Sequence, residues 1–215
     1  MTWVLTIGVI ATGLLSTLLV YLGMGYAERR GLLDAPGQRR SHQVATPRGG
    51  GIGIVIAALL GVGLPLLIVS DADGLIAASV GGMLLVALVG WVDDHNGLPA
   101  RIRFTAHLLA SLALALALLW PVLAMFSWLP SLLMLGVIVF STAWSINLHN
   151  FMDGINGLLA CQAIFVLLVV AILAAVGADS GLAWASLGTA AAVAGFLPWN
   201  FPRARVFMGD VGSGA

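Results

Sequence analysis

The chain has 215 residues, of which 60% are hydrophobic and only 8% are charged, and its formal net charge is zero. Soluble domains carry about 25% charged residues, so this composition excludes an ordinary soluble domain and predicts a protein that lies in a membrane. A neutral chain without lysine also excludes the broad basic surface with which proteins bind nucleic acids.

Seven apolar runs are long enough to cross a bilayer as helices, which takes roughly 17 to 25 residues each. Helices are expected because an isolated strand would leave its backbone polar groups unpaired in lipid. The predicted spans are Trp3–Met24, Gly51–Val69, Leu75–Val92, Phe104–Trp120, Leu132–Ile146, Leu158–Val176 and Leu182–Trp199. No repeat and no soluble domain interrupts them. Residues 1–215 are therefore expected to form a single all-α, polytopic membrane domain.

The distribution of arginine predicts the orientation of these spans. The links after spans 1, 3, 5 and 7 share one side of the membrane, and they contain every arginine: Arg29, Arg30, Arg39, Arg40, Arg48, Arg101, Arg103, Arg203 and Arg205. The opposite links contain only the acids Asp71, Asp73 and Asp179. Because arginine-rich links stay in the cytoplasm, we expect the N-terminus outside and the arginine links inside. Arginines follow the first run instead of preceding it, so we expect a span there and not a cleaved signal.

Four acidic residues lie just past apolar runs on the arginine side: Asp93, Asp94, Asp153 and Asp210. Hydrocarbon cannot solvate a carboxylate, so acids near membrane depth are rare and indicate function. The adjacent carboxylates of Asp93 and Asp94 repel each other unless a cation compensates. Mg²⁺ suits this role because it prefers oxygen ligands and is usually held by one or two carboxylates together with substrate phosphates. The alternative is a solvated acid pair at a helix end.

Polar residues recur every third position through Asn147, Asn150 and Asp153. At about 100° per residue, each step of three drifts by about 60°, so these residues share one stripe of a helix. Asn156 has drifted half a turn, and two glycines beside it weaken the helix. Irregular backbone at this depth is tolerated where it lines a cavity or is buried in protein. Hydrogen bonding between helices is the alternative.

Two further segments are rich in glycine. Residues 49–53 open the second span and resemble a phosphate-cradling helix start, although they lack the Gly-Lys-Ser/Thr of a P-loop. Glycines that permit close helix packing are the alternative. In residues 207–213, glycines flank Asp210 and would let backbone N–H groups approach a phosphate, with Arg203 or Arg205 as a charged partner. These two arginines are otherwise read as membrane anchors.

In this order and on one membrane face, the motifs resemble the polyprenyl-phosphate N-acetylhexosamine-1-phosphate transferases. This family begins the synthesis of peptidoglycan lipid, enterobacterial common antigen and O-antigen. The matching segments span almost the whole chain: Thr46-Pro47-Arg48-Gly49-Gly50-Gly51, Asp93-Asp94, Asn147-x-x-Asn150-x-x-Asp153-Gly154 and Phe207-Met208-Gly209-Asp210-Val211-Gly212-Ser213. Each motif is weak alone, and the combination is specific.

The resemblance implies transfer of a sugar 1-phosphate from a UDP-sugar to undecaprenyl phosphate, with release of UMP. It implies Mg²⁺ as cofactor, with Mn²⁺ as the alternative ion, and Asp210 as the metal ligand. By the same resemblance, the catalytic residues are Asp93 and Asp94 near the lipid phosphate and Asp153 on the nucleotide side. The residues expected to bind substrate are Asn147, Asn150, Asn156, Arg48, Arg101 and Arg205. The expected setting is the bacterial inner membrane, with the site cytoplasmic, and a homodimer is compatible with the sequence.

Two departures from the family pattern refine these expectations. Asn156 stands where many relatives carry a second aspartate, which favours the O-antigen-initiating branch over the phospho-N-acetylmuramoyl-pentapeptide transferases, the alternative. The family has about ten spans and a basic, histidine-containing loop beyond the last motif. We therefore expect a C-terminally truncated chain, the N-terminal two-thirds of the family fold, with an inactive fragment as another alternative. A secondary transporter is less favoured, because transporter sites lie near the membrane midplane and these acids lie at span ends.

Overall fold

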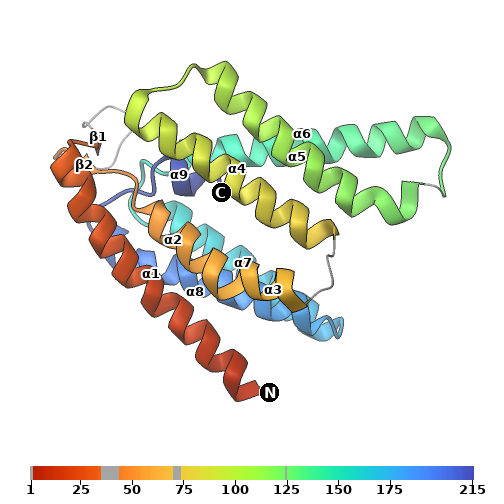
Figure 1. Ribbon diagram of the computed structural model, residues 1–215, viewed down its shortest axis with the longest axis horizontal. Helices are drawn as coiled ribbons and strands as arrows, with labels where there is room; N and C mark the ends of the chain where they lie inside the picture. The colour runs from red at the N-terminus through yellow and green to blue at the C-terminus, as the bar shows by residue number, and fades with distance from the viewer. Residues whose placement is uncertain (1, 35–43, 70–73, 124) are drawn as a thin grey trace.

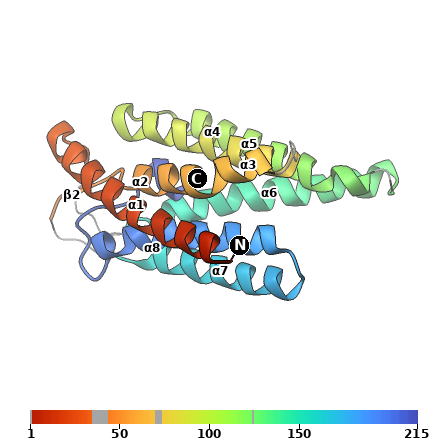
Figure 2. The ribbon, with the colours of Figure 1, turned by 60° about the horizontal axis from the view of Figure 1, so that its bottom comes forward.

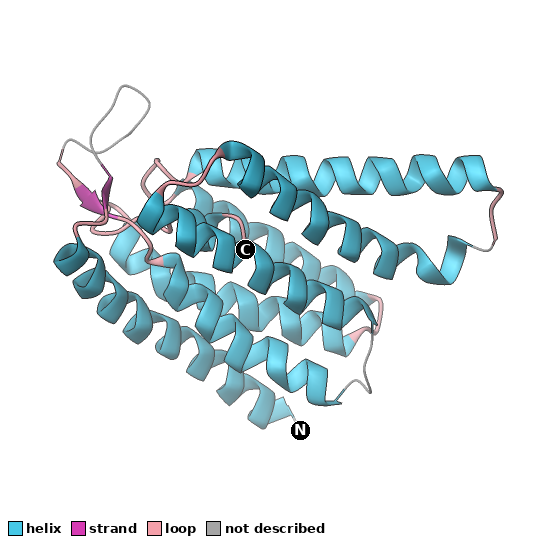
Figure 3. Cartoon of the chain, turned by 45° about the horizontal axis from the view of Figure 1, so that its top comes forward, coloured by secondary structure: helices cyan, strands magenta, loops and turns pink. Residues whose placement is uncertain are grey.

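The computed structural model describes residues 2–34, 44–69, 74–123 and 125–215 (Figure 1). Within these ranges most residues are helical, which confirms the predicted all-α class. The predictions for Arg39, Arg40, Asp71 and Asp73 lie outside the described residues. A hairpin of two short antiparallel strands, β1 (Leu33–Asp34) and β2 (Thr46–Pro47), joins the first two spans. Figure 3 shows these strands at one end of the molecule, beside the tip of α1.

Seven helical segments of the described chain are long and apolar enough to cross a membrane, as predicted. The first is α1 (Thr2–Arg30), and the second combines α2 (Gly51–Ala58), the π-helical turn η1 (Leu59–Gly63) and α3 (Leu64–Val69). The other five are α4 (Gly74–Asn96), α5 (Ala100–Leu123), α6 (Trp128–Met152), α7 (Leu158–Val176) and α8 (Ser180–Asn200). A single turn, α9 (Asp210–Ser213), ends the chain.

Two helices continue further toward the arginine side than their apolar runs. Helix α4 includes Asp93 and Asp94 in its last turns and ends beside Gly97, which has a φ of +66° and accepts this left-handed conformation without strain. Helix α6 includes Asn147 and Asn150. The two acids and the two asparagines are therefore held on rigid helical backbone instead of on flexible links.

The helices pack through small residues and leave one end for the polar loops. Helix α8 packs against both α1 and α7, and α2 lies between α4 and the α1–α8 pair (Figure 2). The Ser16 hydroxyl donates to the Ala192 carbonyl at 2.6 Å, and a side chain on Gly195 would collide with the backbone of α1. Such small-residue interfaces are typical of membrane helices, which gain stability from close packing. Helices α5 and α6 pack on each other and extend beyond the rest (Figure 1).

Candidate active site

The turn α9, at the end of segment 206–213, packs against helices α2, α4 and α6. The N–H of Gly50 donates to the Phe207 carbonyl at 2.9 Å, and the N–H of Gly51 donates to the Met208 carbonyl at 2.8 Å. A Cβ on Gly51 would collide with the backbone of Gly212. These N–H groups bind the chain itself, so the glycines at the start of α2 serve close packing. The structure favours this alternative over the phosphate-cradling helix start.

Two carboxylates hold the last motif in place. Asp153 accepts hydrogen bonds from the N–H groups of Met208 at 3.0 Å and Gly209 at 2.7 Å. Asp94 accepts from the N–H groups of Asp210 and Val211, each at 3.2 Å. Four consecutive N–H groups are therefore taken by carboxylates and do not point at an open phosphate position. This contradicts the expectation that residues 207–213 present free N–H groups to a phosphate.

Asp94 and Asp153 differ in how deeply their side chains are buried. The side chain of Asp94 is only 1% exposed, and its Oδ1 lies 3.7 Å from Nε of Arg48, which also donates through Nη2 to the Asp94 carbonyl at 2.9 Å. Asp153 is half-buried at the end of α6. Burial raises the pKa of Asp153 to about 7, against the opposing effect of the Gly209 and Met208 N–H groups. Both carboxylates lie in the predicted site and set the position of its loop.

Asp210 is the centre of the site. Its Oδ2 accepts from Nη1 of Arg103 at 2.8 Å, and its Oδ1 accepts from Nδ2 of Asn150 at 2.7 Å. The same Nη1 of Arg103 lies 3.0 Å from Oδ2 of Asp93, so one guanidinium joins two carboxylates from different elements. Burial tends to raise the pKa of Asp210, but its hydrogen bonds with Asp93, Asn150 and Arg103 outweigh this effect and lower the pKa. Asp210 is therefore ionised at neutral pH.

Two cavities meet at Asp210 and Asn150, which line both. The first, here called the lateral cavity, has a volume of about 380 Å³ between α4, α5 and α6 and is further lined by Val89, Arg101, Arg103, Phe104, His107 and Asn147. The second, called the loop cavity, has a volume of about 260 Å³ and is further lined by Asp34, Arg48, Phe151, Asp153, Gly154 and Phe207. A reacting centre beside Asp210 would be reached from either cavity.

The structure brings most of the predicted site residues together, with two exceptions. Among the described residues that line the two cavities, neither Asn156 nor Arg205 is found. Nδ2 of Asn156 donates to the Pro202 carbonyl at 3.3 Å, and the exposed Arg205 donates its backbone N–H to Trp199. The half-turn drift of Asn156 from the Asn147–Asn150–Asp153 stripe explains its separate location. The anchor alternative suits Arg205.

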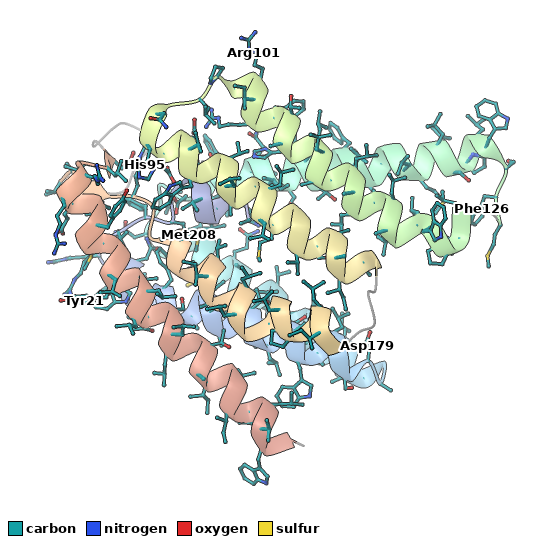
Figure 4. The ribbon with its side chains drawn as sticks, viewed as in Figure 1. Tyr21, His95, Arg101, Phe126, Asp179 and Met208 are labelled. Atoms are coloured by element: carbon teal, nitrogen blue, oxygen red, sulfur yellow. The ribbon has the colours of Figure 1, made fainter. Side chains whose placement is uncertain are left out.

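The two arginines that begin α5 have different contacts, and the predicted Arg101 is the one further from the acids. Arg101 is exposed at the rim of the lateral cavity, and its side chain extends away from the body of the molecule (Figure 4). Arg103 makes the contacts with Asp93 and Asp210 instead. His107 was also missed, although it stands four residues after Arg103 and therefore on the same face of α5. That spacing was the available signal.

The residues around Asp210 offer carboxylate oxygens of the kind that Mg²⁺ prefers as ligands, although only a few of them. Carboxylate oxygens of Asp210 and Asp93 face a common cation position, now occupied by Arg103. No cluster of three or more His, Cys, Asp or Glu side chains suited to a metal occurs in the described ranges. This fits an ion that is held by one or two carboxylates and completed by substrate phosphates and water.

A stability prediction follows from the conformation of Gly209, whose φ is +71°. A Cβ there would lie 2.6 Å from both Oδ2 of Asp94 and the backbone N of Gly49. We expect Gly209→Ala to lower the free energy of unfolding by about 2–4 kcal/mol, from left-handed strain plus the collision. Thermal unfolding in detergent measures it.

Gly97→Ala is the matched control, because Gly97 has a φ of +66° and open space around its Cβ position. It should cost only about 1 kcal/mol. Equal losses in the two variants would show that the close approach of Gly209 to Asp94 and Gly49 contributes nothing.

These observations define the class: a multi-pass membrane protein with a carboxylate–arginine site at one end of its helical bundle. Residues 76–215 match the sequence model of glycosyl transferase family 4. The chain belongs to this family.

Several curated proteins are similar to it. The decaprenyl-phosphate N-acetylglucosaminephosphotransferase of Mycolicibacterium smegmatis is 33% identical over 230 residues, covering 94% of this chain and 55% of the relative. The probable undecaprenyl-phosphate N-acetylglucosaminyl 1-phosphate transferase of Bacillus subtilis is 30% identical over 188 residues, covering 85% and 52%. The phospho-N-acetylmuramoyl-pentapeptide-transferase of Deinococcus radiodurans is 33% identical over 236 residues, covering 96% and 71%. The chain spans about half the length of the first two relatives.

Proposed function

We propose that the protein transfers N-acetylhexosamine 1-phosphate from a UDP-sugar to a polyprenyl phosphate, as an enzyme of the bacterial inner membrane. The observation that carries the proposal is the position of Asp210, an ionised carboxylate at the junction of two cavities and in contact with Arg103. A two-substrate transfer needs such a meeting point. The names of the relatives, all phosphosugar transferases acting on polyprenyl phosphates or on a muramoyl pentapeptide, support the substrate class.

The proposed reaction exchanges one phosphorus–oxygen bond for another. An oxygen of the lipid phosphate attacks the β-phosphorus of the UDP-sugar and forms a diphosphate. The bond between that phosphorus and the oxygen bridging to the α-phosphate breaks, and its electron pair leaves with UMP. The lipid phosphate is already anionic, so it needs little activation as a nucleophile. Catalysis then depends on positioning and on neutralisation of charge, as in other phosphoryl transfers.

The loop cavity suits the sugar nucleotide. Arg48 lines it with a guanidinium that contacts Asp94 and is partly exposed, and this cation can pair with a phosphate. Asn150 provides a polar surface for a nucleotide, and the exposed ring of Phe151 provides a stacking surface. Asp210, with Asp93, would hold Mg²⁺. The ion, when bound, supplies charge neutralisation for the donor phosphates and the leaving UMP.

The orientation and the donor sugar are part of the same proposal. The described arginines lie in links and at helix ends, on the side of the bundle that carries the site. The positive-inside rule therefore supports a cytoplasmic location for the site. UDP-N-acetylglucosamine is the favoured donor, because Asn156 favours the O-antigen-initiating branch. UDP-N-acetylmuramoyl-pentapeptide is the second candidate, supported by the similarity to the Deinococcus protein.

The test uses membranes from cells that express the open reading frame containing residues 1–215. Radiolabelled UDP-N-acetylglucosamine and polyprenyl phosphate are added with Mg²⁺, and label is counted in butanol-extractable lipid. We expect incorporation above vector membranes, loss of incorporation with EDTA, and release of UMP in equal amount. Incorporation only from UDP-N-acetylmuramoyl-pentapeptide would assign the protein to the second branch. Absence of incorporation from either donor would refute the proposed function.

A further inference from the structure

We infer that Arg103 makes binding of the divalent cation conditional on the sugar nucleotide. Its guanidinium lies between the carboxylates of Asp93 and Asp210, in the position that the cation would take. It leaves this position when a donor phosphate binds together with the ion, and it then pairs with that phosphate. The inference rests on the proposed function and gives one side chain two successive partners in the same site.

The carboxylates of Asp93 and Asp210 have all four oxygens engaged. In Asp93, Oδ1 accepts from the N–H of Leu98, and Oδ2 accepts from Nη1 of Arg103 at 3.0 Å. In Asp210, Oδ1 accepts from Nδ2 of Asn150 at 2.7 Å, and Oδ2 accepts from Nη1 of Arg103 at 2.8 Å. A cation that binds to these carboxylates must therefore replace one of the three donors.

Arg103 is the donor that a cation displaces most readily. The N–H of Leu98 belongs to the backbone of the link after α4, and the amide of Asn150 is neutral. Arg103 is itself a cation, so a divalent ion beside both carboxylates would repel it. Its side chain is long and 35% exposed, and it lines the lateral cavity. That cavity, with a volume of about 380 Å³, has room for the displaced guanidinium.

The two carboxylates offer few oxygens to an ion that binds without a further anion. Once Arg103 moves, Oδ2 of Asp93 and Oδ2 of Asp210 become available, whereas the other two oxygens keep their donors. Mg²⁺ requires octahedral oxygen coordination and usually combines one or two carboxylates with substrate phosphates. Binding of the ion alone would also cost Arg103 both of its charged partners, and hydrogen bonds between charged groups are the strong ones. The guanidinium and the ion therefore compete in protein without nucleotide.

A donor phosphate removes this competition. It supplies oxygen ligands to the ion and, at the same time, an anion to Arg103, whose guanidinium can bind a phosphate through two N–H groups. Arg103 contacts Asp210 at the junction of the two cavities, which is where the donor phosphates would lie. The ion and the nucleotide are therefore expected to bind cooperatively, and each raises the affinity for the other by the same factor.

The first test measures binding of Mn²⁺ to the detergent-purified protein without nucleotide, from the loss of the electron paramagnetic resonance signal of free Mn²⁺. Arg103→Gln removes the competing cation. We expect its Kd for Mn²⁺ to be about tenfold lower than that of the wild type, the effect of one charged hydrogen bond. Arg101→Gln is the matched control, because Arg101 lines the rim of the same cavity and extends away from the body of the molecule. Its Kd should stay within about threefold of the wild type.

The second test repeats the titration with saturating UMP, after subtraction of the Mn²⁺ that UMP binds without protein. UMP should tighten Mn²⁺ binding about tenfold more in the wild type than in Arg103→Gln, because only the wild type has a displaced cation that UMP can pair with. Asp210→Asn should weaken Mn²⁺ binding about tenfold or more with either residue at position 103, which locates the measured ion. If Arg103→Gln does not accumulate in membranes, Arg103→Met, which also removes the charge, replaces it.

Three results would overturn the inference: equal Kd values for Mn²⁺ in the wild type and Arg103→Gln without nucleotide, an equal gain of affinity in Arg101→Gln, or equal tightening by UMP in the wild type and Arg103→Gln. Failure of the proposed function has a different signature. Membranes would then transfer no sugar phosphate, while the tighter Mn²⁺ binding of Arg103→Gln without nucleotide would remain measurable.

Discussion

Asp210→Asn is expected to lower the rate of sugar-phosphate transfer by about 1000-fold. A metal ion held by a carboxylate stabilises the charge of such a transition state by several kcal/mol. Asparagine keeps the size of the side chain, and its single carbonyl oxygen can still accept from either Arg103 or Asn150. It removes the negative charge that would hold a cation between the protein and the donor phosphates. The loss should therefore appear in activity and not in folding. Exchange of labelled UMP into the UDP-sugar, measured in membranes, reports the chemical step directly.

Asp179→Asn is the control for this substitution. Asp179 caps α8 by accepting from the N–H of Leu182, a role that asparagine also fills, and it lies at the opposite end of the bundle from Met208 (Figure 4). Its activity should equal that of the wild type. Near-normal exchange by Asp210→Asn at ordinary magnesium concentration would contradict the assignment of Asp210.

Arg103→Gln is expected to have the second largest effect, a loss of about 100-fold in transfer together with a lower melting temperature. The guanidinium contacts both Asp93 and Asp210, and without it two carboxylates would face each other with no cation between them. Breaking a pair of this partly exposed kind costs about 2 kcal/mol, between the values for surface and buried ion pairs. Saturating Mg²⁺ should restore part of the lost stability, because a divalent cation can occupy the same position. Thermal unfolding with and without Mg²⁺ measures this rescue.

Substitutions of two other arginines distinguish the specific contact of Arg103 with Asp210 from a general effect of positive charge. Arg29→Gln removes an exposed charge at the end of α1, on the arginine side of the predicted spans. This substitution should leave transfer and stability unchanged. Arg101→Gln, at the rim of the lateral cavity, should reduce transfer by less than tenfold. An Arg101→Gln loss as large as that of Arg103→Gln would show that the charge of the link, and not the contact with Asp210, is what the site requires.

Composition and local residue spacing were sufficient to predict the membrane helices and the clustering of the polar residues. Long apolar runs specify membrane helices because lipid leaves no other partner for backbone N–H and carbonyl groups. The three-residue spacing of Asn147, Asn150 and Asp153 placed them on one stripe, and the structure confirms that all three line the cavities at Asp210. The clustering of the four predicted acids at one end followed from counting spans, because successive links lie on alternate sides of the membrane.

The contacts between side chains of different helices could not be predicted from local patterns. The contact of Arg103, and not Arg101, with Asp210 depends on the rotation of α5 against α4 and α6, which no local pattern encodes. The capture of the Met208–Val211 N–H groups by Asp94 and Asp153 joins residues more than 50 positions apart. The close crossing of Gly51 and Gly212 is likewise a long-range contact. Side-chain periodicity fixes directions around one helix axis, whereas the distances between helices are set by packing across the whole bundle.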